Sequence, residues 1–252
     1  MNRIALITGA TSGIGRATTL TLSENNFDVI ITGRRKELLE ELKKEINKKS
    51  TNKIHILHFD IRNKAEVDKA IDSLPAEWQD IDVLVNNAGL AVGLEHIHEG
   101  FIDDWERMID TNVKGLLYIT RKVSPKMVEK KHGHIINIGS TAGKEAYEKG
   151  NVYCGTKHAV DAITKGMRID LLTHKIKVTA INPGMVETEF SLVRFKGDKD
   201  KADKVYKGFT PLYGKDVADA ILYVITRPEH VCINDMIITA TAQANSFYKV
   251  VE

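Results

Sequence analysis

Tyr153 and Lys157 stand four residues apart in a stretch whose pattern predicts a helix over residues 151–173. On a helix, this spacing places the two side chains on the same face. A phenol has an ordinary pKa of about 10, but a neighbouring ammonium group favours the ionised form and lowers that pKa. Such a pair can take a proton from an alcohol or return one to a carbonyl. A Tyr and a Lys at this spacing also occur on ordinary exposed helix faces, so the pair alone does not establish catalysis.

Two polar residues elsewhere in the chain support the catalytic interpretation. Ser140 closely follows a predicted strand at residues 135–138. Ligands bind at the carboxyl edge of a parallel sheet, where the Ser140 hydroxyl could hydrogen-bond the reacting oxygen. Asn112 lies in a predicted helix at residues 102–113, although asparagine is a poor helix former. Holding a water beside Lys157 would explain it, and an asparagine satisfied locally in the core is the alternative.

A glycine-rich turn follows the first predicted strand, at residues 4–7. Gly9 permits a tight turn, Gly13 lets the backbone approach a pyrophosphate, and Gly15 lets the next helix pack closely on the sheet. The start of that helix offers free amide groups to phosphates. A plain strand-to-helix turn is the alternative, but the place after the first strand of a repeated βαβ pattern favours nucleotide binding. The candidate cofactor ligands here are Gly9, Thr11, Ser12, Gly13, Ile14 and Gly15.

The end of the second predicted strand, residues 29–32, bears on the choice between NAD and NADP. In NAD-binding folds an acidic residue roughly 20 positions after the glycine turn binds the ribose hydroxyls, but here Arg34 holds that position. Arg34, Arg35 and Arg16 could bind a 2′-phosphate through charge-assisted hydrogen bonds, so NADP is the predicted cofactor. A solvated start of the next helix is the alternative. Asp60 is a candidate either for the adenine amino group or for the N-cap region of a helix.

Apolar runs and helical patterns alternate along the chain, which implies right-handed βαβ units and a parallel sheet with helices on both faces. The sequence has no repeat, linker or break in composition, so one domain over residues 1–252 is expected. A polar, basic stretch at residues 190–207 belongs to a mobile excursion, roughly residues 186–212, that is expected to cover the substrate. The expected strands are 4–7, 29–32, 54–59, 83–85, 135–138, 178–181 and 236–239, and the expected helices are 13–25, 35–49, 64–74, 102–113, 114–131, 151–173 and 215–226.

Composition limits the classes of protein to which the chain can belong. Its 252 residues suit one α/β domain, and a formal net charge of +2 argues against nucleic acid as the partner. The two cysteines, Cys154 and Cys232, lack metal-ligand spacing, so neither a metal nor a disulfide framework is expected. The N-terminus lacks the features of a signal peptide, and no apolar run approaches the roughly 20 residues of a membrane span. We therefore expect a cytoplasmic protein that does not act at a membrane.

These motifs, together with Asn86-Asn87-Ala88-Gly89 and Pro183-Gly184, resemble the signature of the short-chain dehydrogenase/reductase family, in order over essentially the whole chain. The resemblance implies a single-domain Rossmann-like sheet of about seven strands and a homotetramer. It also implies a catalytic tetrad in which Tyr153 is the general acid/base, Lys157 lowers its pKa and binds the nicotinamide ribose, and Ser140 orients the substrate oxygen. Asn112 would support a water-linked proton relay. The further cofactor contacts that it implies are Asn87, Ala88, Gly89, Pro183, Gly184, Val186 and Thr188.

A narrower resemblance concerns the substrate. Residues 133–140, 150–153, 187–191, 193–198 and 226–228 are similar to the NADP-dependent 3-hydroxy acid dehydrogenase branch of the family, which includes enzymes for serine and L-allo-threonine. The resemblance implies oxidation of the 3-hydroxyl group of a small hydroxy acid, or the reverse reduction. Two alternatives remain open. One is a reductase of broader carbonyl or 3-oxoacyl compounds, and the other is an NADP-binding sensor without turnover.

A hydroxy acid substrate requires a partner for its carboxylate. Arg194 or Lys196 could supply it, with arginine offering the better bidentate geometry. Both residues could instead be solvent-facing charges or serve a subunit contact, because their segment is rich in charge. Tyr147 is a further candidate for the substrate pocket, beside Ser140 and Tyr153.

Overall fold

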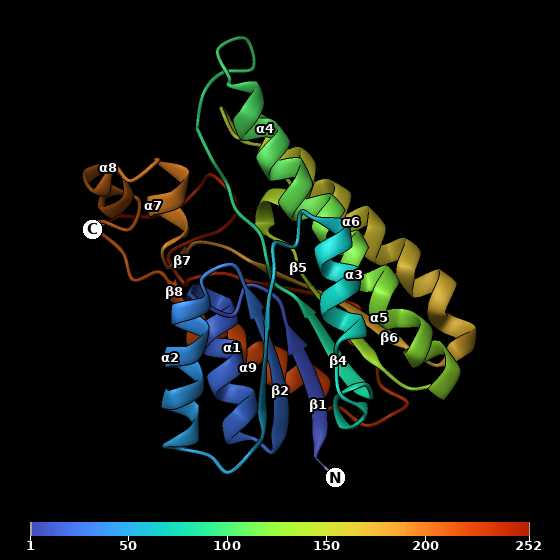
Figure 1. The fold of residues 1–252 in the computed structure, drawn as a ribbon. Coiled ribbons are helices and arrows are strands. Elements are labelled where there is room, and N and C mark those ends of the chain that lie inside the picture. The colour runs from blue at the N-terminus through green and yellow to red at the C-terminus, as the bar shows by residue number, and fades with distance from the viewer. Residues whose placement is uncertain (1, 252) are drawn as a thin grey trace.

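Seven short runs rich in β-branched and aliphatic residues form one parallel sheet in the computed structural model, which describes residues 2–251 (Figure 1). The strand order is β3-β2-β1-β4-β5-β6-β9, so the direction of winding changes between β1 and β4. Strands β1, β2 and β4 to β6 are largely buried, as parallel strands covered by helices on both faces must be. The predicted seven-stranded, doubly wound sheet is confirmed. The strands are β1 (Arg3–Ile7), β2 (Phe27–Gly33), β3 (Ile54–His58), β4 (Ile81–Asn86), β5 (His134–Ile138), β6 (Lys177–Pro183) and β9 (Asp235–Ile238).

Alternate residues of a strand face opposite layers of helices. In β1, Ala5 and Ile7 pack into one buried apolar cluster, whereas Ile4 and Leu6 pack into another. The first cluster includes side chains of α1, α2 and α9, and the second includes side chains of α3 and α5; Figure 1 shows these two groups on opposite sides of the sheet. The helices are α1 (Gly13–Glu24), α2 (Lys36–Asn47), α3 (Lys64–Asp72), α4 (Ile102–Ile109), α5 (Leu116–Lys130), α6 (Asn151–Leu171) and α9 (Gly214–Ile225).

The two helices predicted at residues 102–113 and 114–131 form one continuous helical run. A π-helical turn, η2 (Asp110–Gly115), joins α4 to α5 and contains Asn112. Such turns interrupt α-helices frequently at functional sites. Gly115 lets this turn pack closely on Ile61, because a Cβ at that position would lie 3.0 Å from Ile61 Cγ2. The π-helical turn thus lies where the sequence has an asparagine that a regular helix disfavours.

Residues 190–207 contain regular structure that the sequence analysis did not predict. Two short helices, α7 (Phe190–Arg194) and α8 (Lys199–Lys204), lie between β7 (Val186–Glu187) and β8 (Leu212–Tyr213), which pair in parallel. These elements are too short to show a hydrophobic period. The C-terminal segment packs on this region, where Lys249 Nζ donates to the Val205 carbonyl at 2.6 Å. Within residues 2–251, no helix combines the length and apolar character needed to cross a bilayer.

Buried His134 in β5 makes stability depend on pH. The Thr179 hydroxyl donates to the Ile233 carbonyl at 2.6 Å, so it accepts from His134 Nε2 at 2.8 Å. Burial, aided by the charges of Lys177 and Arg3, lowers the pKa of His134 from 6.5 to about 3. Between these pH values the unfolded chain binds a proton that the folded chain does not. The free energy of unfolding should therefore fall as pH falls below 6.5, by up to about 1.4 kcal/mol per pH unit.

We expect His134→Gln to remove this contribution, because glutamine keeps an N–H donor but does not titrate. Chemical denaturation at pH 7.5 and pH 5 would measure it. The loss of stability between these pH values should be smaller in the variant by up to about 2 kcal/mol. His98→Gln, which changes an exposed histidine, is the control and should behave as wild type. Equal losses in His134→Gln and wild type would show that His134 is not the titrating group.

Candidate active site

A cavity of about 470 Å³ lies along the carboxyl edge of the sheet. Its lining includes residues at or just beyond the ends of five strands, namely Gly9 after β1, Gly33 at the end of β2, Asn87 after β4, Gly139 after β5 and Pro183 at the end of β6. Because neighbouring strands are parallel, their carboxyl ends meet at one edge. The cavity also spans the β1–β4 boundary where the winding reverses, which is the usual ligand position in open α/β sheets.

Tyr153, Lys157 and Ser140 line this cavity together, as predicted. Tyr153 and Lys157 lie one turn apart on α6, on its buried side, and are 8% and 7% exposed. Lys157 Nζ donates to the Ile138 carbonyl at the end of β5 at 2.8 Å. Ser140 begins the short 3-10 helix η3 (Thr141–Gly143), and its Oγ accepts from the Ala142 amide at 3.1 Å. The three groups capable of proton chemistry therefore meet where β5 and α6 come together.

Burial dominates the proton affinities of the Tyr153–Lys157 pair. It raises the pKa of the Tyr153 phenol above its ordinary value, while the charge of Arg194 and the nearby Ser140 hydroxyl oppose the rise. Burial lowers the pKa of Lys157 to about 8. Lys157 was expected to lower the pKa of Tyr153, but in this structure the charge that lowers it is that of Arg194, and burial raises it. With a pKa of about 8, Lys157 still carries its proton at neutral pH.

Both polar atoms of the Asn112 side chain hydrogen-bond the protein. Its Oδ1 accepts from the Leu90 amide, and its Nδ2 donates to the Leu90 carbonyl, both at 2.8 Å, and to Thr156 Oγ1 at 3.0 Å. These contacts account for an asparagine at this buried position, and the water-linked relay stays a prediction. Asn112 still lies near Lys157, since a Cβ on Gly89 would be 3.3 Å from Asn112 Oδ1 and 3.7 Å from Lys157 Nζ. It joins the π-helical turn to the loop after β4 and to α6.

The glycine-rich turn has the geometry expected of a phosphate-binding turn. Gly9 and Gly13 adopt φ of +67° and +51°, in the left-handed region that side chains disfavour. A Cβ at Gly15 would lie 2.3 Å from the Gly9 carbonyl oxygen, so Gly15 packs against the turn and does not line the cavity. The bare backbone around the start of α1 fits a diphosphate. The other predicted cofactor residues all line the cavity, namely Gly9, Thr11, Ser12, Gly13, Ile14, Arg34, Arg35, Asp60, Asn87, Ala88, Gly89, Tyr153, Lys157, Pro183, Gly184, Val186 and Thr188.

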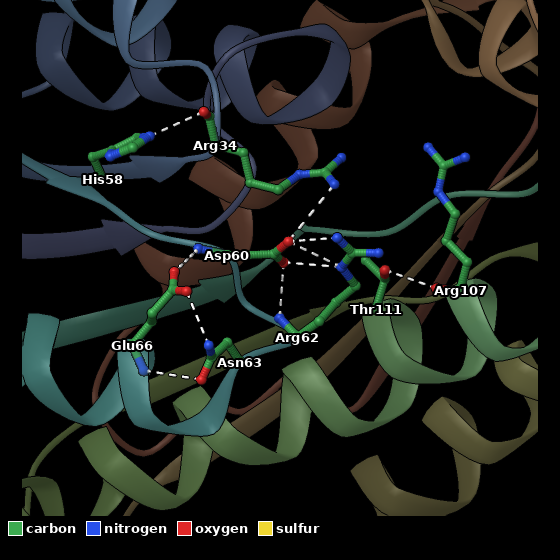
Figure 2. Close-up of polar contacts among 8 residues, drawn as sticks. All are labelled: Arg34, His58, Asp60, Arg62, Asn63, Glu66, Arg107 and Thr111. Carbon is green, nitrogen blue, oxygen red and sulfur yellow. Dashed lines mark hydrogen bonds and ion pairs between the residues drawn. The ribbon is translucent and has the colours of Figure 1, made fainter.

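Asp60 is held by an arginine that the sequence analysis missed. Arg62 Nε and Nη2 donate to its carboxylate at 2.6–3.1 Å, and Arg34 Nη1 lies 3.8 Å from Asp60 Oδ2 (Figure 2). Burial alone would raise the pKa of Asp60, but the hydrogen bonds and charge of Arg62 and the charge of Arg34 lower it. Asn63, not Asp60, caps α3 by accepting from the amides of Ala65 and Glu66. Asp60 is therefore not the cap itself, but it lies in the N-cap region, where its amide donates to Glu66 Oε2 at 2.9 Å.

The three arginines considered for a 2′-phosphate have different surroundings. Arg34 and Arg35 line the cavity, and Arg35 contacts Thr11 Oγ1 through Nη2 at 2.9 Å. Arg16 forms an ion pair with Glu45 of α2 and does not line the cavity, so its proposed role was wrong. Arg107 of α4 does line it. It was missed because helical periodicity does not reveal which residues of a helix reach a distant turn.

The structure separates the two candidates for a carboxylate partner. The Arg194 guanidinium lies over the rings of Tyr153 and Tyr147, at 5.0 and 5.7 Å from their centres, and donates to the Tyr147 hydroxyl. Its buried Nε has no hydrogen-bond partner among the residues described. Lys196 Nζ is instead paired with Asp104 at 2.7 Å. Neither Arg194 nor Tyr147 lines the cavity directly, but both adjoin it through Tyr153.

The sequence of this chain matches the family model for short chain dehydrogenases over residues 3–198. The chain belongs to the short chain dehydrogenase family. This confirms the family inferred from the motifs. This short chain dehydrogenase is 50% identical, over 92% of its length and 93% of the relative's, to the NADP-dependent 3-hydroxy acid dehydrogenase YdfG of Escherichia coli. It is 43% identical to the NADP-dependent 3-hydroxy acid dehydrogenase of Schizosaccharomyces pombe, over 97% of this chain and 95% of that one.

A solved structure gives the same result for the fold. The closed form of serine dehydrogenase complexed with NADP+ superposes with a TM-score of 0.93. It shares 48% sequence identity with this short chain dehydrogenase, and the match covers 99% of both chains. Similarity over nearly the whole length includes the excursion that contains α7 and α8.

Proposed function

We propose that this short chain dehydrogenase transfers a hydride between NADP(H) and the 3-hydroxyl or 3-oxo group of a small 3-hydroxy acid such as L-serine or L-allo-threonine. The main support for this proposal is the position of Arg194. Its guanidinium lies 5.0 Å from the centre of the Tyr153 ring and keeps a buried N–H without a partner among the described residues. A carboxylate is the group that an arginine binds best. An acid held there would present its hydroxyl carbon near the catalytic tyrosine.

In this proposal, the ionised phenolate of Tyr153 takes the proton of the substrate hydroxyl during oxidation, and the phenol returns it during reduction. Burial disfavours the phenolate, and the positive charges of Lys157 and, when bound, of the oxidised nicotinamide ring would favour it. Ser140 hydrogen-bonds the same oxygen and orients it. Lys157 supplies a positive charge near the developing alkoxide and binds the nicotinamide ribose. Asn112 holds α6 against the loop after β4 through its hydrogen bonds, and Tyr147 positions Arg194. NADP, when bound, supplies the hydride-accepting ring.

The cofactor would lie along the carboxyl edge of the sheet. The glycine-rich turn from Gly9 to Gly15 would hold its diphosphate, and Arg34 and Arg35 its 2′-phosphate. Asp60 would accept from the adenine amino group. Asn87, Ala88, Gly89, Pro183, Gly184, Val186 and Thr188 would border its nicotinamide half.

We also propose that the protein is a cytoplasmic homotetramer. The helical run from α4 to α5 leaves large apolar side chains exposed. Ile102 is 59% exposed, and Ile109 and Leu117 are each 40% exposed. Exposed apolar patches commonly mark protein contacts.

Initial rates of NADPH formation with a panel of alcohols test the proposed reaction. We expect activity with L-serine, L-allo-threonine, 3-hydroxybutyrate and 3-hydroxyisobutyrate, and little with a secondary alcohol that lacks a carboxylate. Arg194→Met keeps the apolar stem but removes the charge. It should lower kcat/KM for the acids by about 10- to 100-fold, the worth of a charged hydrogen bond, and should affect the alcohol much less.

Lys196→Met is the matched control, since it removes a cation from the same segment that is paired with Asp104. It should leave kcat/KM for the acids near the wild-type value. Activity confined to the carboxylate-free alcohol would instead support a broader carbonyl reductase. NADP binding without any turnover would support a sensor.

A further inference from the structure

Arg35 joins two parts of the chain that border the cofactor cavity. Its Nε and Nη2 donate to Thr11 Oγ1 of the glycine-rich turn at 3.3 and 2.9 Å. Its Nη1 forms an ion pair with Glu189 Oε2 at 3.0 Å. Arg35 and Glu189 are 154 residues apart in the sequence, and both line the cavity. One guanidinium therefore connects the start of α2 with the start of α7.

The Glu189 carboxylate already accepts a hydrogen bond from the Arg35 guanidinium, which a phosphate would need for its own binding. Arginine binds a phosphate best through two parallel N–H donors, whereas here one of its terminal nitrogens is held by Glu189 and the other by Thr11. A dianionic 2′-phosphate beside this carboxylate would also experience repulsion between like charges. A phosphate and the Glu189 carboxylate therefore compete for the Arg35 guanidinium.

We propose that Glu189 competes with the 2′-phosphate of NADP for Arg35, and that phosphate binding releases Glu189. Glu189 thereby sets how strongly the protein discriminates between phosphorylated and unphosphorylated cofactors. This inference rests on the proposed placement of the 2′-phosphate at Arg34 and Arg35. It adds a specificity residue from a part of the chain that does not belong to the nucleotide-binding half of the sheet.

Release of Glu189 would directly affect α7, which lies on the substrate side of the cavity. Glu189 immediately precedes α7, which contains Phe190 and Arg194. The Phe190 ring packs edge-on against the Tyr153 ring at 5.6 Å, and Arg194 lies over the same ring at 5.0 Å. A change at Glu189 is thus one short helix away from the proposed carboxylate partner. Binding of the 2′-phosphate would therefore change the position of α7, and with it Phe190 and Arg194 beside Tyr153.

Binding of two adenosine fragments isolates this end of the cofactor. Adenosine 2′,5′-bisphosphate has the 2′-phosphate, and adenosine 5′-monophosphate lacks it. Calorimetry on the full chain at low salt measures the affinity for each fragment. Glu189→Gln should bind the bisphosphate about two- to fivefold more tightly than wild type, as expected for losing an exposed ion pair that competes. Binding of the monophosphate should not change. The gain should disappear in Arg35→Gln/Glu189→Gln relative to Arg35→Gln, and it should shrink at high salt.

Glu187→Gln is the matched control. It removes one negative charge two residues earlier, from an exposed side chain that does not line the cavity, and should leave both affinities unchanged. Unchanged or weaker bisphosphate binding by Glu189→Gln would overturn the competition, as would an equal gain from Glu187→Gln. If wild type binds the two fragments equally, the placement of the 2′-phosphate fails first, and the competition fails with it.

Amide hydrogen exchange tests the release of α7 without any turnover. Saturating bisphosphate should speed exchange in α7 of the wild-type protein. In Glu189→Gln, exchange there should already be fast without ligand and should change little on binding. Wild-type α7 exchange that does not respond to the bisphosphate would contradict the release.

Discussion

Tyr153→Phe should lower kcat by about two to four orders of magnitude, the contribution of a positioned acid/base group, and leave NADP affinity near the wild-type value. The hydroxyl is the only group removed, and the ring keeps its packing against Phe190 at 5.6 Å and under Arg194 at 5.0 Å. The fold and cavity should therefore persist. Initial rates with an accepted hydroxy acid and titration of NADP binding measure the two quantities separately.

Tyr147→Phe is the control, because it removes another phenolic hydroxyl in the same region. Its hydroxyl accepts from Arg194 but does not line the cavity. It should raise KM for the hydroxy acid more than it lowers kcat, because it loosens the carboxylate partner without removing the proton donor. A Tyr153→Phe variant with near wild-type kcat would refute the role given to Tyr153, and equal losses of kcat in both variants would leave that role unsupported.

Lys157→Met should abolish most turnover and yet make the chain more stable. The methionine keeps the apolar stem and removes the buried ammonium. Because burial lowers the pKa of Lys157 from 10.5 to about 8, the unfolded chain binds this proton more tightly than the folded chain does. The free energy of unfolding should therefore rise with pH between about 8 and 10.5, and below pH 8 the full cost of about 3 kcal/mol applies.

The net gain in Lys157→Met should be smaller than that cost. The variant loses the hydrogen bond to the Ile138 carbonyl, which leaves a buried acceptor unpaired at a cost of about 1 to 3 kcal/mol. We expect a stability increase of up to about 2 kcal/mol at pH 7. Chemical denaturation at pH 7 and pH 10, without cofactor, measures it, and the increase should diminish at the higher pH.

Lys165→Met, on the same helix, is the matched control. Its side chain is 60% exposed and pairs with Asp161, so its effect on stability should stay within about 0.5 kcal/mol, and its activity should be normal. Loss of stability in Lys157→Met by several kcal/mol would show that the hydrogen bond to Ile138 outweighs the desolvation of the ammonium.

Much of the fold and the centre of the site follow from local sequence. The seven strands are short apolar runs between helices of sufficient length, and each occurs at its predicted place. Gly9 and Gly13 are glycines because their φ values of +67° and +51° disfavour side chains. Tyr153 and Lys157 share a helix face because they are four residues apart. Each of these features depends on a few neighbouring residues, so the sequence alone determines them.

Features that depend on distant partners were decided only by the tertiary structure. Lys196 pairs with Asp104 and Arg16 with Glu45, neither residue lines the cavity, and neither pairing has a sequence signal. The Asn112 side chain accepts from the Leu90 amide and donates to Thr156 Oγ1, partners that its helix position did not predict. The pKa values of Tyr153 and Lys157 are shifted mainly by burial, which depends on the elements packed around α6. Burial and pairing result from packing elements that are far apart in the chain, whereas strand, turn and helix-face patterns do not.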